Sequence, residues 1–442
     1  MTQTGTALGL DEAQERFPTA AVAWFGVAIL VLLSIVSMLD RQIVSLMVGD
    51  IKAAYGASDS QIGLLQGAAF SLVYAFAALP FGYAADRYSR RMTLFIGVFV
   101  WSLAAIFCGL SNSFNTLLAA RIGVGFGEAA LNPVITSLLG DMFPQHRRTF
   151  AFSVVSVGSL IGVTGALIIG GAVLHWAGNG VDLPLLGHLP AWKFAFIACG
   201  APGLVLAFAA FFMIEPPRRA KDSPDADVSW AEAGQHLRAS GRFYLCYLGG
   251  FTALGSGSYG LMTWTPAVLQ RIYGWSAAQS GLVGGSLIAI CGIVGTLSVG
   301  RIVDVMFRRG RRDAHALFYT CSGLLFVVCG LGGALASSAW WFLALILPVK
   351  LVTNFSGIAM AGLTLVADKR MRGRVAALYS VVTVASSAAI GPSAVAFLTD
   401  VVFRDEAMLQ WSVGINMVVF GLLGTLLLYL AQRPMRQSVI DA

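Results

Sequence analysis

Residues 55–91 read YGASDSQIGLLQGAAFSLVYAFAALPFGYAADRYSRR, and residues 273–309 read YGWSAAQSGLVGGSLIAICGIVGTLSVGRIVDVMFRR. The two stretches align without a gap at a constant offset of 218, and twelve of their 37 positions are identical. Shared apolar composition could explain matched leucines, but it does not explain a matched aspartate and a matched pair of arginines at the end of each stretch. We infer that the chain contains an internal duplication.

The duplicated stretches lie in a chain whose composition is typical of an integral membrane protein. Of its 442 residues, 57% are hydrophobic and only 12% are charged, about half the charged fraction of a typical soluble protein. A helix of about 20 apolar residues crosses the ~30 Å hydrocarbon core of a membrane. Twelve apolar runs of this kind occur, at 20–48, 60–83, 92–110, 114–140, 149–174, 193–214, 243–269, 276–303, 314–336, 339–366, 375–402 and 408–431. Because the runs are long and do not alternate, they predict helices and not a β-barrel.

The predicted fold is therefore an all-α membrane protein with twelve transmembrane helices in two six-helix, pseudo-symmetric bundles. The offset of 218 joins the second span to the eighth, so both halves have the same orientation, as in transporters whose site lies between two parallel repeats. The polar stretch 215–242 predicts a linker with a short amphipathic helix at 228–239. The expected parts are an N-terminal tail (1–19), a first bundle (20–214), the linker (215–242), a second bundle (243–432) and a C-terminal tail (433–442).

The formal charge of +7 is distributed as membrane topology requires. One set of alternating loops holds 22 Lys and Arg residues, whereas the opposite loops hold four: Lys52, Lys193, Arg271 and Arg404. The positive-inside rule then places both termini and the linker in the cytoplasm. The first apolar run is longer than a signal-peptide core and follows acidic residues, so we expect a first span and not a cleaved signal. Topology explains the basic residues, and no nucleic-acid partner is expected.

Nothing in the sequence suggests a metal site, a cofactor or an enzyme. The six cysteines all fall within predicted spans, without a CxxC or another metal-ligand spacing, and such cysteines are usually small apolar filler. There is no nucleophile–base pair or phosphate-binding loop, and the glycine runs lie within spans, where helix packing explains them.

Five ionisable residues fall well within the predicted spans: Asp40, Arg41, Arg121, Glu128 and Lys350. A charge at the centre of a bilayer costs a few kcal/mol or more, so each of these residues should face a cavity or a partner. Three bases against two acids leave one positive charge over if both acids are ionised, and an anion or water should complete it.

Roles for these charges follow from their chemistry. Asp40 and Glu128 are the predicted proton carriers, because a carboxylate holds or releases a proton according to whether a base is engaged with it. Arg41, Arg121 and Lys350 are the predicted anion ligands. Purely structural roles remain open for the Asp40–Arg41 pair, for Glu128 and for Lys350. Arg121 and Glu128 stand two helical turns apart, about 10 Å along the axis, which is too far for a direct pair.

The second half offers a less polar lining. Residues 255–266 read GSGSYGLMTWTP, and the residues predicted to contact substrate here are Tyr259, Trp264 and Asn354, with packing as the alternative. A charged first half and an apolar second half would suit an amphiphile, which has a headgroup for one side and a chain for the other.

The duplicated motif GxxxD…RR predicts gates at the cytoplasmic ends of spans 2 and 8. Glycine allows a tight helix end, and the aspartate can pair with a base on a neighbouring helix end. Arg148 is one candidate base. The gate residues are Gly82, Asp86, Arg90 and Arg91, with Gly300, Asp304 and Arg308 in the second half and Arg148 as partner. A merely solvated charged turn is the alternative, but a solvated turn has no need to be duplicated.

These features resemble the major facilitator superfamily over the whole chain. More narrowly, LDRQIV, YGASDSQIGLLQ, GYAADRYSRR, RIGVGFGEAALNPVITSLLGDMFPQHRRT and WKFAFIACGAPGLVLA are similar to the Spinster-like branch. The branch's functional acid and base fall on Asp40 and Arg41. Its RxxxGxGEA motif falls on Arg121, Gly125, Gly127, Glu128 and Ala129. Animal members continue with SY, where this chain has Ala130 and Leu131.

This resemblance implies proton-driven or proton-gated transport of lysophospholipids or sphingoid-base phosphates by a membrane-embedded protein, which we expect to be a monomer. The short termini suit a bacterial inner-membrane member. Two alternatives stay open: an exporter of small organic anions or drugs, which would show no preference for a long acyl chain, and a receptor or scaffold that does not cycle. The duplicated gates argue against the latter.

Overall fold

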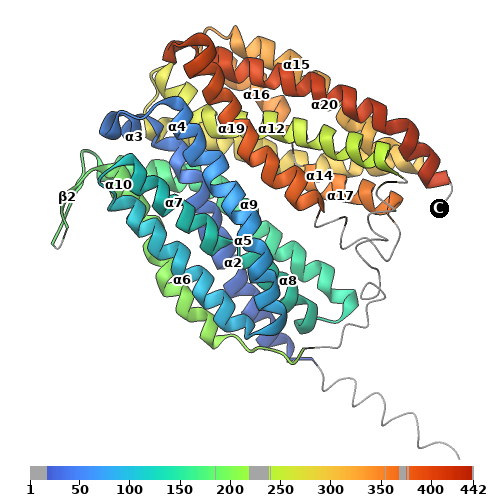
Figure 1. Cartoon of the computed structure of the whole chain (residues 1–442), viewed down its shortest axis with the longest axis horizontal. Helices are drawn as coiled ribbons and strands as arrows, with labels where there is room; N and C mark the ends of the chain where they lie inside the picture. The colour runs from blue at the N-terminus through green and yellow to red at the C-terminus, as the bar shows by residue number, and fades with distance from the viewer. Residues whose placement is uncertain are drawn as a thin grey trace, which may run out of the picture. The chain divides into compact units, whose positions relative to one another are not determined.

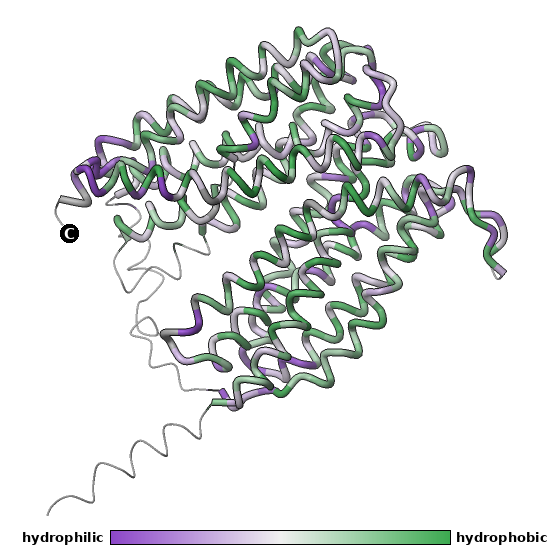
Figure 2. Tube along the Cα trace, turned by 180° about the vertical axis from the view of Figure 1, so that it is seen from behind, coloured by the Kyte–Doolittle hydropathy of each residue, from purple (hydrophilic) through white to green (hydrophobic). Residues whose placement is uncertain are grey.

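The structure is a computed structural model that describes residues 17–184, 186–218, 238, 240–353, 355–367, 375 and 378–440. Within these residues, eleven helical segments are long and apolar enough to cross a membrane. The helix α12 (Gly241–Arg271) supplies the twelfth; the polar residues from Ser256 to Thr265 make it less apolar than the others. Hydrophobic residues run along the helices, and hydrophilic residues gather at many of their ends (Figure 2). The predicted all-α membrane fold is confirmed.

The chain divides into two compact units (Figure 1). The first unit contains residues 1–41, 73–166 and 180–222, and the second contains residues 42–72, 167–179 and 223–442. The helices and strands that supply the first unit are α2 (Ala20–Gln42), α5 (Ala69–Arg87), α6 (Arg90–Gly109), α7 (Phe114–Glu128), α8 (Leu131–Met142), α9 (Gln145–Ala177), the hairpin β1 (Val181–Leu183) and β2 (Gly187–Leu189), α10 (Ala191–Ala209) and η3 (Ala210–Phe212).

The second unit contains the remaining elements. They are η1 (Ile43–Leu46), α3 (Val48–Tyr55), α4 (Asp59–Gly63), η2 (Leu64–Ala68), α12, α13 (Ala277–Gln279), η5 (Ser280–Gly284), α14 (Gly285–Arg308), α15 (Ala314–Ala334), α16 (Ala339–Val352), α17 (Phe355–Val366), η7 (Ser380–Ala385), α19 (Ser386–Phe397), η8 (Leu398–Phe403), η9 (Glu406–Met408) and α20 (Leu409–Ile440). The ends of α5 and α9 also belong to this unit.

The duplication seen in the sequence is also a duplication of local structure. Gly56 and Gly274, at matched positions, adopt left-handed φ angles of 62° and 69°, which glycine reaches without steric cost. Two residues later, Ser58 and Ser276 each form a capping box with a glutamine three positions on. Each helix then contains a π-turn, η2 in one repeat and η5 in the other. The shared YGxSxxQ sequence therefore specifies the same helix start twice.

Two predicted spans are broken in ways the apolar runs did not indicate. The fourth span divides into α7 and α8 directly after Glu128. Pro133 is the cause, because proline has no N–H to donate to the carbonyl of Ala129 and its ring conflicts with that carbonyl. The tenth span divides into α16 and α17 near Thr353. Both breaks lie close to charged residues within the membrane, Glu128 and Lys350.

Glycines in α7 bring it against α6, as their spacing predicted. A Cβ atom at Gly127 would lie 2.5 Å from the Trp101 nitrogen and 2.6 Å from the Gly97 oxygen, and one at Gly123 would lie 3.1 Å from the Ala104 Cβ. Only glycine permits so close an approach of backbones at position 127. This contact fixes the position of Glu128, the next residue, relative to α6.

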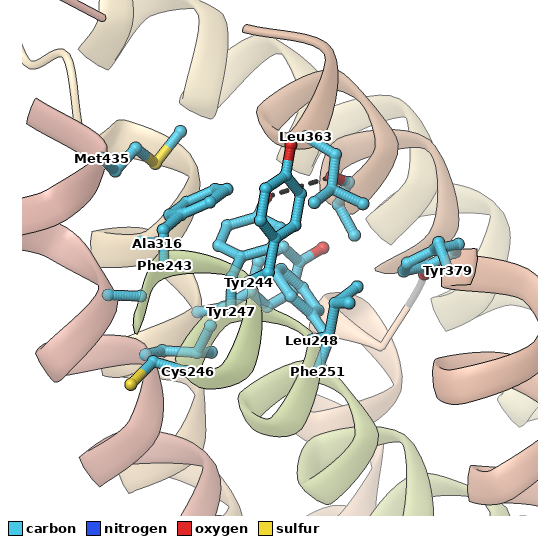
Figure 3. Close-up of a cluster of buried hydrophobic side chains, with 14 of the residues drawn as sticks. Phe243, Tyr244, Cys246, Tyr247, Leu248, Phe251, Ala316, Leu363, Tyr379 and Met435 are labelled. Atoms are coloured by element: carbon cyan, nitrogen blue, oxygen red, sulfur yellow. Dashed lines mark hydrogen bonds between the residues drawn. The ribbon is translucent and has the colours of Figure 1, made fainter. Parts of the chain in front are cut away.

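An aromatic core is buried in the second unit (Figure 3). Phe243, Tyr247 and Phe251 lie on one face of α12, and their rings contact one another in tilted pairs, with centroids 5.0 and 4.9 Å apart. The Tyr247 hydroxyl donates to the Ala359 carbonyl at 3.1 Å, which satisfies the one polar atom that this buried side chain carries. Tyr379 belongs to the same buried cluster.

Parts of the predicted organisation lie outside the described residues. The amphipathic helix predicted at 228–239 falls there except for Arg238, as do most of the N-terminal tail and Asn354. At the C-terminus, α20 continues beyond the predicted end of the last span to Ile440. The hairpin between α9 and α10 was not predicted from the sequence.

Candidate substrate and proton site

Asp40 ends the first span in a buried position. It lies in the last turn of α2 and is only 1% exposed. Neither of its carboxylate oxygens has a hydrogen-bond partner among the described residues. Because an orphaned buried carboxylate is costly while it is charged, this is a place where a proton can be held.

Arg41 pairs with Glu128 and not with its neighbour Asp40. The Arg41 Nη2 lies 2.6 Å from the Glu128 Oε2, and the two side chains are 24% and 0% exposed respectively. The second carboxylate oxygen of Glu128 has no partner among the described residues. The arginine of this pair is therefore partly accessible from outside the protein, whereas the glutamate is not.

Arg121 is used differently from the other two bases. It is 1% exposed, and its guanidinium donates to the backbone carbonyls of Asp40 (2.9 Å) and Arg41 (3.0 Å). These carbonyls belong to the last turn of α2, where helical acceptors lack partners and a cation is favoured. Arg121 therefore holds the end of α2 against α7 and fixes the backbone of the two residues on which the site depends.

Two residues that sequence reasoning missed complete this region. The Arg41 guanidinium lies over the Tyr74 ring, 5.2 Å from its centroid, a cation–π arrangement. The Tyr74 hydroxyl accepts a hydrogen bond from the Asn132 Nδ2 at 2.7 Å. Asn132 lies in the first turn of α8, just beyond the break that follows Glu128, and it is exposed. The Asn–Pro pair at 132–133 was the available signal.

The other predicted substrate ligands belong to the second unit. Lys350 lies in the last turn of α16 and is 6% exposed, with no carboxylate within ion-pair distance among the described residues. Tyr259 is partly exposed on α12. Trp264 is fully buried, and its indole N–H donates to the Pro392 carbonyl at 3.0 Å. This contact packs Trp264 against α19.

Arg90 is the centre of the first predicted gate. It is 1% exposed, and its guanidinium reaches the Asp141 carboxylate at 2.5 Å, the Pro216 carbonyl at 2.6 Å and the Glu215 carboxylate at 3.5 Å. Arg90 thereby ties the start of α6 to α8 and to the chain that leaves η3. Asp141 and Glu215 were not predicted as its partners.

The remaining residues of that gate lie nearby on helix ends. Arg91 donates to the Met213 carbonyl at 3.2 Å. Arg148, which the sequence offered as one candidate partner of Asp86, donates to the Gly140 carbonyl near the end of α8, at 2.5 Å. Gly82 and Asp86 lie in the last two turns of α5, where Asp86 is exposed.

The matching residues of the second half lie at the end of α14. Gly300, Asp304 and Arg308 follow one another at four-residue intervals, and Asp304 and Arg308 are exposed. The duplicated motif thus ends a helix in both halves, as predicted.

The Glu215 carboxylate holds residues of the first predicted gate together in a pH-dependent way. It accepts hydrogen bonds from the Ser89 hydroxyl and the Arg90 backbone N–H, both at 2.7 Å. Burial works against the charged form, but these hydrogen bonds and the Arg90 charge outweigh it, so the pKa of Glu215 lies below its usual value. Its stabilisation is therefore complete above the unfolded pKa of about 4.3 and is lost as pH falls through the lower, folded pKa.

We predict that Glu215→Gln lowers the free energy of unfolding by about 1 kcal/mol at neutral pH, and that the difference from the wild type shrinks below about pH 4. Thermal unfolding of the detergent-purified protein at pH 7 and pH 4 measures this. Asp182→Asn is the control, because that carboxylate is 86% exposed. A Glu215→Gln difference that is the same at both pH values would show that the charge of Glu215 contributes nothing.

A second group of charges, here called the outer cluster, consists of Lys52, Asp59, Arg271, Asp400 and Glu406. At its centre, Asp59 is fully buried and accepts from Arg271 at 2.7 and 2.9 Å and from Lys52 at 2.6 Å. Lys52 also reaches Glu406 at 2.7 Å. The Asp400 carboxylate accepts from the Ser60 backbone N–H at 2.5 Å and caps α4.

The outer cluster joins the start of the second span to the ends of the seventh and eleventh. Sequence reasoning counted Lys52 and Arg271 only as loop charges and did not foresee this network.

The comparisons with known proteins agree with this architecture. The sequence profile of the Major Facilitator Superfamily matches residues 30–392. The chain therefore belongs to the Major Facilitator Superfamily, a family of membrane transporters and not of enzymes.

Among its relatives, Protein spinster homolog 1 of Xenopus laevis is 28% identical over 72% of this chain and 59% of that protein. An MFS-type efflux pump of Mycolicibacterium smegmatis is 24% identical over 100% of this chain and 99% of that protein. A D-galactonate transporter of Escherichia coli is 24% identical over 75% of this chain and 84% of that protein. The Spinster-like resemblance inferred from the motifs is thus confirmed.

A solved structure has the same fold. It is a bacterial homologue of the human lysosomal transporter Spinster, in an inward-facing and unoccupied conformation, with a TM-score of 0.78 at 21% identity over 95% of this chain and 99% of that one.

Proposed function

We propose that this protein is a proton-coupled, alternating-access transporter of amphipathic anions, of the lysophospholipid or sphingosine-phosphate kind. We further propose that it works as a monomer in a bacterial inner membrane, with both termini in the cytoplasm. The observation that carries the proposal is the pair between a partly exposed arginine, Arg41, and a fully buried carboxylate, Glu128.

Such a pair couples an anion to a proton. An anionic headgroup that reaches the exposed side of Arg41 competes with Glu128 for the same guanidinium. Arginine holds phosphate through two parallel hydrogen bonds. Glu128 would then be a buried carboxylate without its base, and taking up a proton is the cheapest way to relieve that cost. Loss of the proton would restore the pair and release the anion.

Asp40 is the second proton carrier in this proposal. Its carboxylate oxygens have no hydrogen-bond partner in the part of the chain that the structure describes, while Arg121 fixes its backbone. Protonation of Asp40 would therefore change charge without moving the end of α2. The two carboxylates lie on α2 and α7, which Arg121 joins. A change in the charge of one carboxylate would therefore affect the other.

The remaining predicted ligands would serve the less polar part of the substrate. We propose Lys350, Tyr259 and Asn354 as contacts in the second unit. Trp264 would join them only if its hydrogen bond to Pro392 opened during the cycle. The gates would be the residues around Arg90 and, in the second half, those around Asp304, with the outer cluster closing the other side.

A second candidate substrate class is small organic anions. The D-galactonate transporter and a hexuronate transporter of Bacillus subtilis, 27% identical over 84% of this chain, are named for small sugar acids. A carboxylate could occupy Arg41 as a phosphate could. The two classes differ in whether a long acyl chain adds affinity. A non-cycling receptor is disfavoured, because it needs neither an ion pair that exchanges a proton nor duplicated gates.

The experiment is uptake of labelled lysophosphatidylglycerol by proteoliposomes, with unlabelled lysolipids of increasing chain length and D-galactonate as competitors. We expect competition to strengthen with each added methylene, since each buried CH₂ contributes about 0.8 kcal/mol. Competition by D-galactonate with no effect of chain length would replace the lipid by a small organic anion.

A further inference from the structure

The amide of Asn132 offers an unused hydrogen-bonding edge beside the anion site. Its Nδ2 donates to the Tyr74 hydroxyl at 2.7 Å, and Tyr74 lies beneath the Arg41 guanidinium, 5.2 Å from centroid to cation. The amide oxygen and the second N–H of Asn132 have no protein partner among the residues the structure describes. The Asn132 amide thus keeps one acceptor and one donor free, and Tyr74 connects it to the base that would hold the anion.

The position of this edge is fixed by the broken fourth span. Glu128 is the last residue of α7, and Asn132 lies in the first turn of α8. Pro133 prevents a continuous helix, so Asn132 does not simply stack one turn above Glu128. The Asn132 backbone carbonyl accepts from the Thr136 hydroxyl at 2.9 Å, and the side chain is held by Tyr74. The side-chain amide is therefore held by its hydrogen bond to Tyr74, while its other edge stays exposed.

We propose that Asn132 is a specificity-determining residue that reads a hydroxyl group placed next to the anion of the substrate. This inference rests on the proposed function and names the headgroup class: an anion that carries neighbouring hydroxyls, such as a phosphoglycerol. A hydroxyl both donates and accepts, as the free amide edge does. A bare alkyl or quaternary ammonium group does neither, and would leave the amide unpaired once water is displaced.

The test compares two lipids that differ only in these hydroxyls. Palmitoyl-lysophosphatidylglycerol is set against the analogue whose glycerol headgroup is replaced by n-propanol, with the same phosphate, charge and chain. The wild type should prefer the glycerol lipid by about tenfold, because a site built to pair a hydroxyl rejects the analogue that lacks it. Asn132→Leu should reduce the preference to near unity by weakening the glycerol lipid and not the propanol lipid.

Thr136→Val is the matched control, since Thr136 lies one turn further along α8 and, among the described residues, its hydroxyl hydrogen-bonds only to the Asn132 backbone carbonyl. It should keep the preference. A wild type without preference, or an unchanged preference in Asn132→Leu, would overturn the assignment even if both lipids are carried. If neither lipid is carried, the proposed function fails separately. Binding of glycerol 3-phosphate against propyl phosphate, in the wild type and Asn132→Leu, then decides the role of Asn132 by the same ratio.

Discussion

Arg41→Gln should abolish substrate transport and also destabilise the protein, for two separable reasons. The variant removes the partly exposed cation of the Arg41–Glu128 pair, so the anion loses its partner. It also leaves the fully buried Glu128 carboxylate without its base. Breaking a buried ion pair from one side typically costs about 3–5 kcal/mol. Thermal unfolding and lysolipid uptake, measured on the same preparation, report the two losses.

The double variant Arg41→Gln with Glu128→Gln separates these effects. Removing the second charge removes the unpaired carboxylate, so most of the lost stability should return. Transport should not return, because the anion ligand is still missing. If the double variant is as unstable as Arg41→Gln alone, the pair contributes packing and not charge. If it transports normally, Arg41 is not the anion ligand.

Asp59→Asn should have the largest effect of any change in the outer cluster. Asp59 is fully buried and is shared by Arg271 and Lys52, so its loss leaves two cations around a neutral amide. We expect a loss of about 3–5 kcal/mol in the free energy of unfolding, with slower transport because closure on this side is weakened. Thermal unfolding at low and high salt measures the first quantity.

Glu406→Gln is the matched control for that change. Glu406 pairs with the same lysine, but its side chain is 61% exposed, and exposed pairs contribute about 0–1 kcal/mol. Its effect should also diminish with salt, whereas that of Asp59→Asn should persist, because buried pairs are screened less. Equal effects of the two substitutions would contradict a central role for Asp59.

Much of the architecture could be predicted from the sequence, because hydrophobic length and the internal repeat are properties of single segments. The aligned stretches 55–91 and 273–309 predicted an internal duplication, and the structure has the same left-handed glycine and capping box twice. The glycines of the fourth span predicted the close approach of another helix, which is α6. The break before Pro133 could have been predicted from the proline alone.

The partners of the charged residues could not be predicted, because they depend on how helices rotate against one another. Arg41 could have faced Asp40 or Glu128, and only the packing of α2 on α7 selects Glu128. No sequence pattern indicates that Arg121 donates to the backbone carbonyls of Asp40 and Arg41, and its contact with substrate stays a prediction. Tyr74 contributes a single polar atom to an apolar run, and its role depends on the Arg41 guanidinium lying over its ring.

The central claim is that the movement of an anion is coupled to a proton held by Asp40 or Glu128. The most direct measurement is lysophosphatidylglycerol uptake into proteoliposomes with and without an imposed pH gradient, for the wild type, Asp40→Asn and Glu128→Gln. We predict that the gradient drives accumulation in the wild type and that at least one substitution leaves only gradient-independent exchange. Uptake that ignores the gradient in all three proteins would contradict the claim and would leave both carboxylates with a structural role.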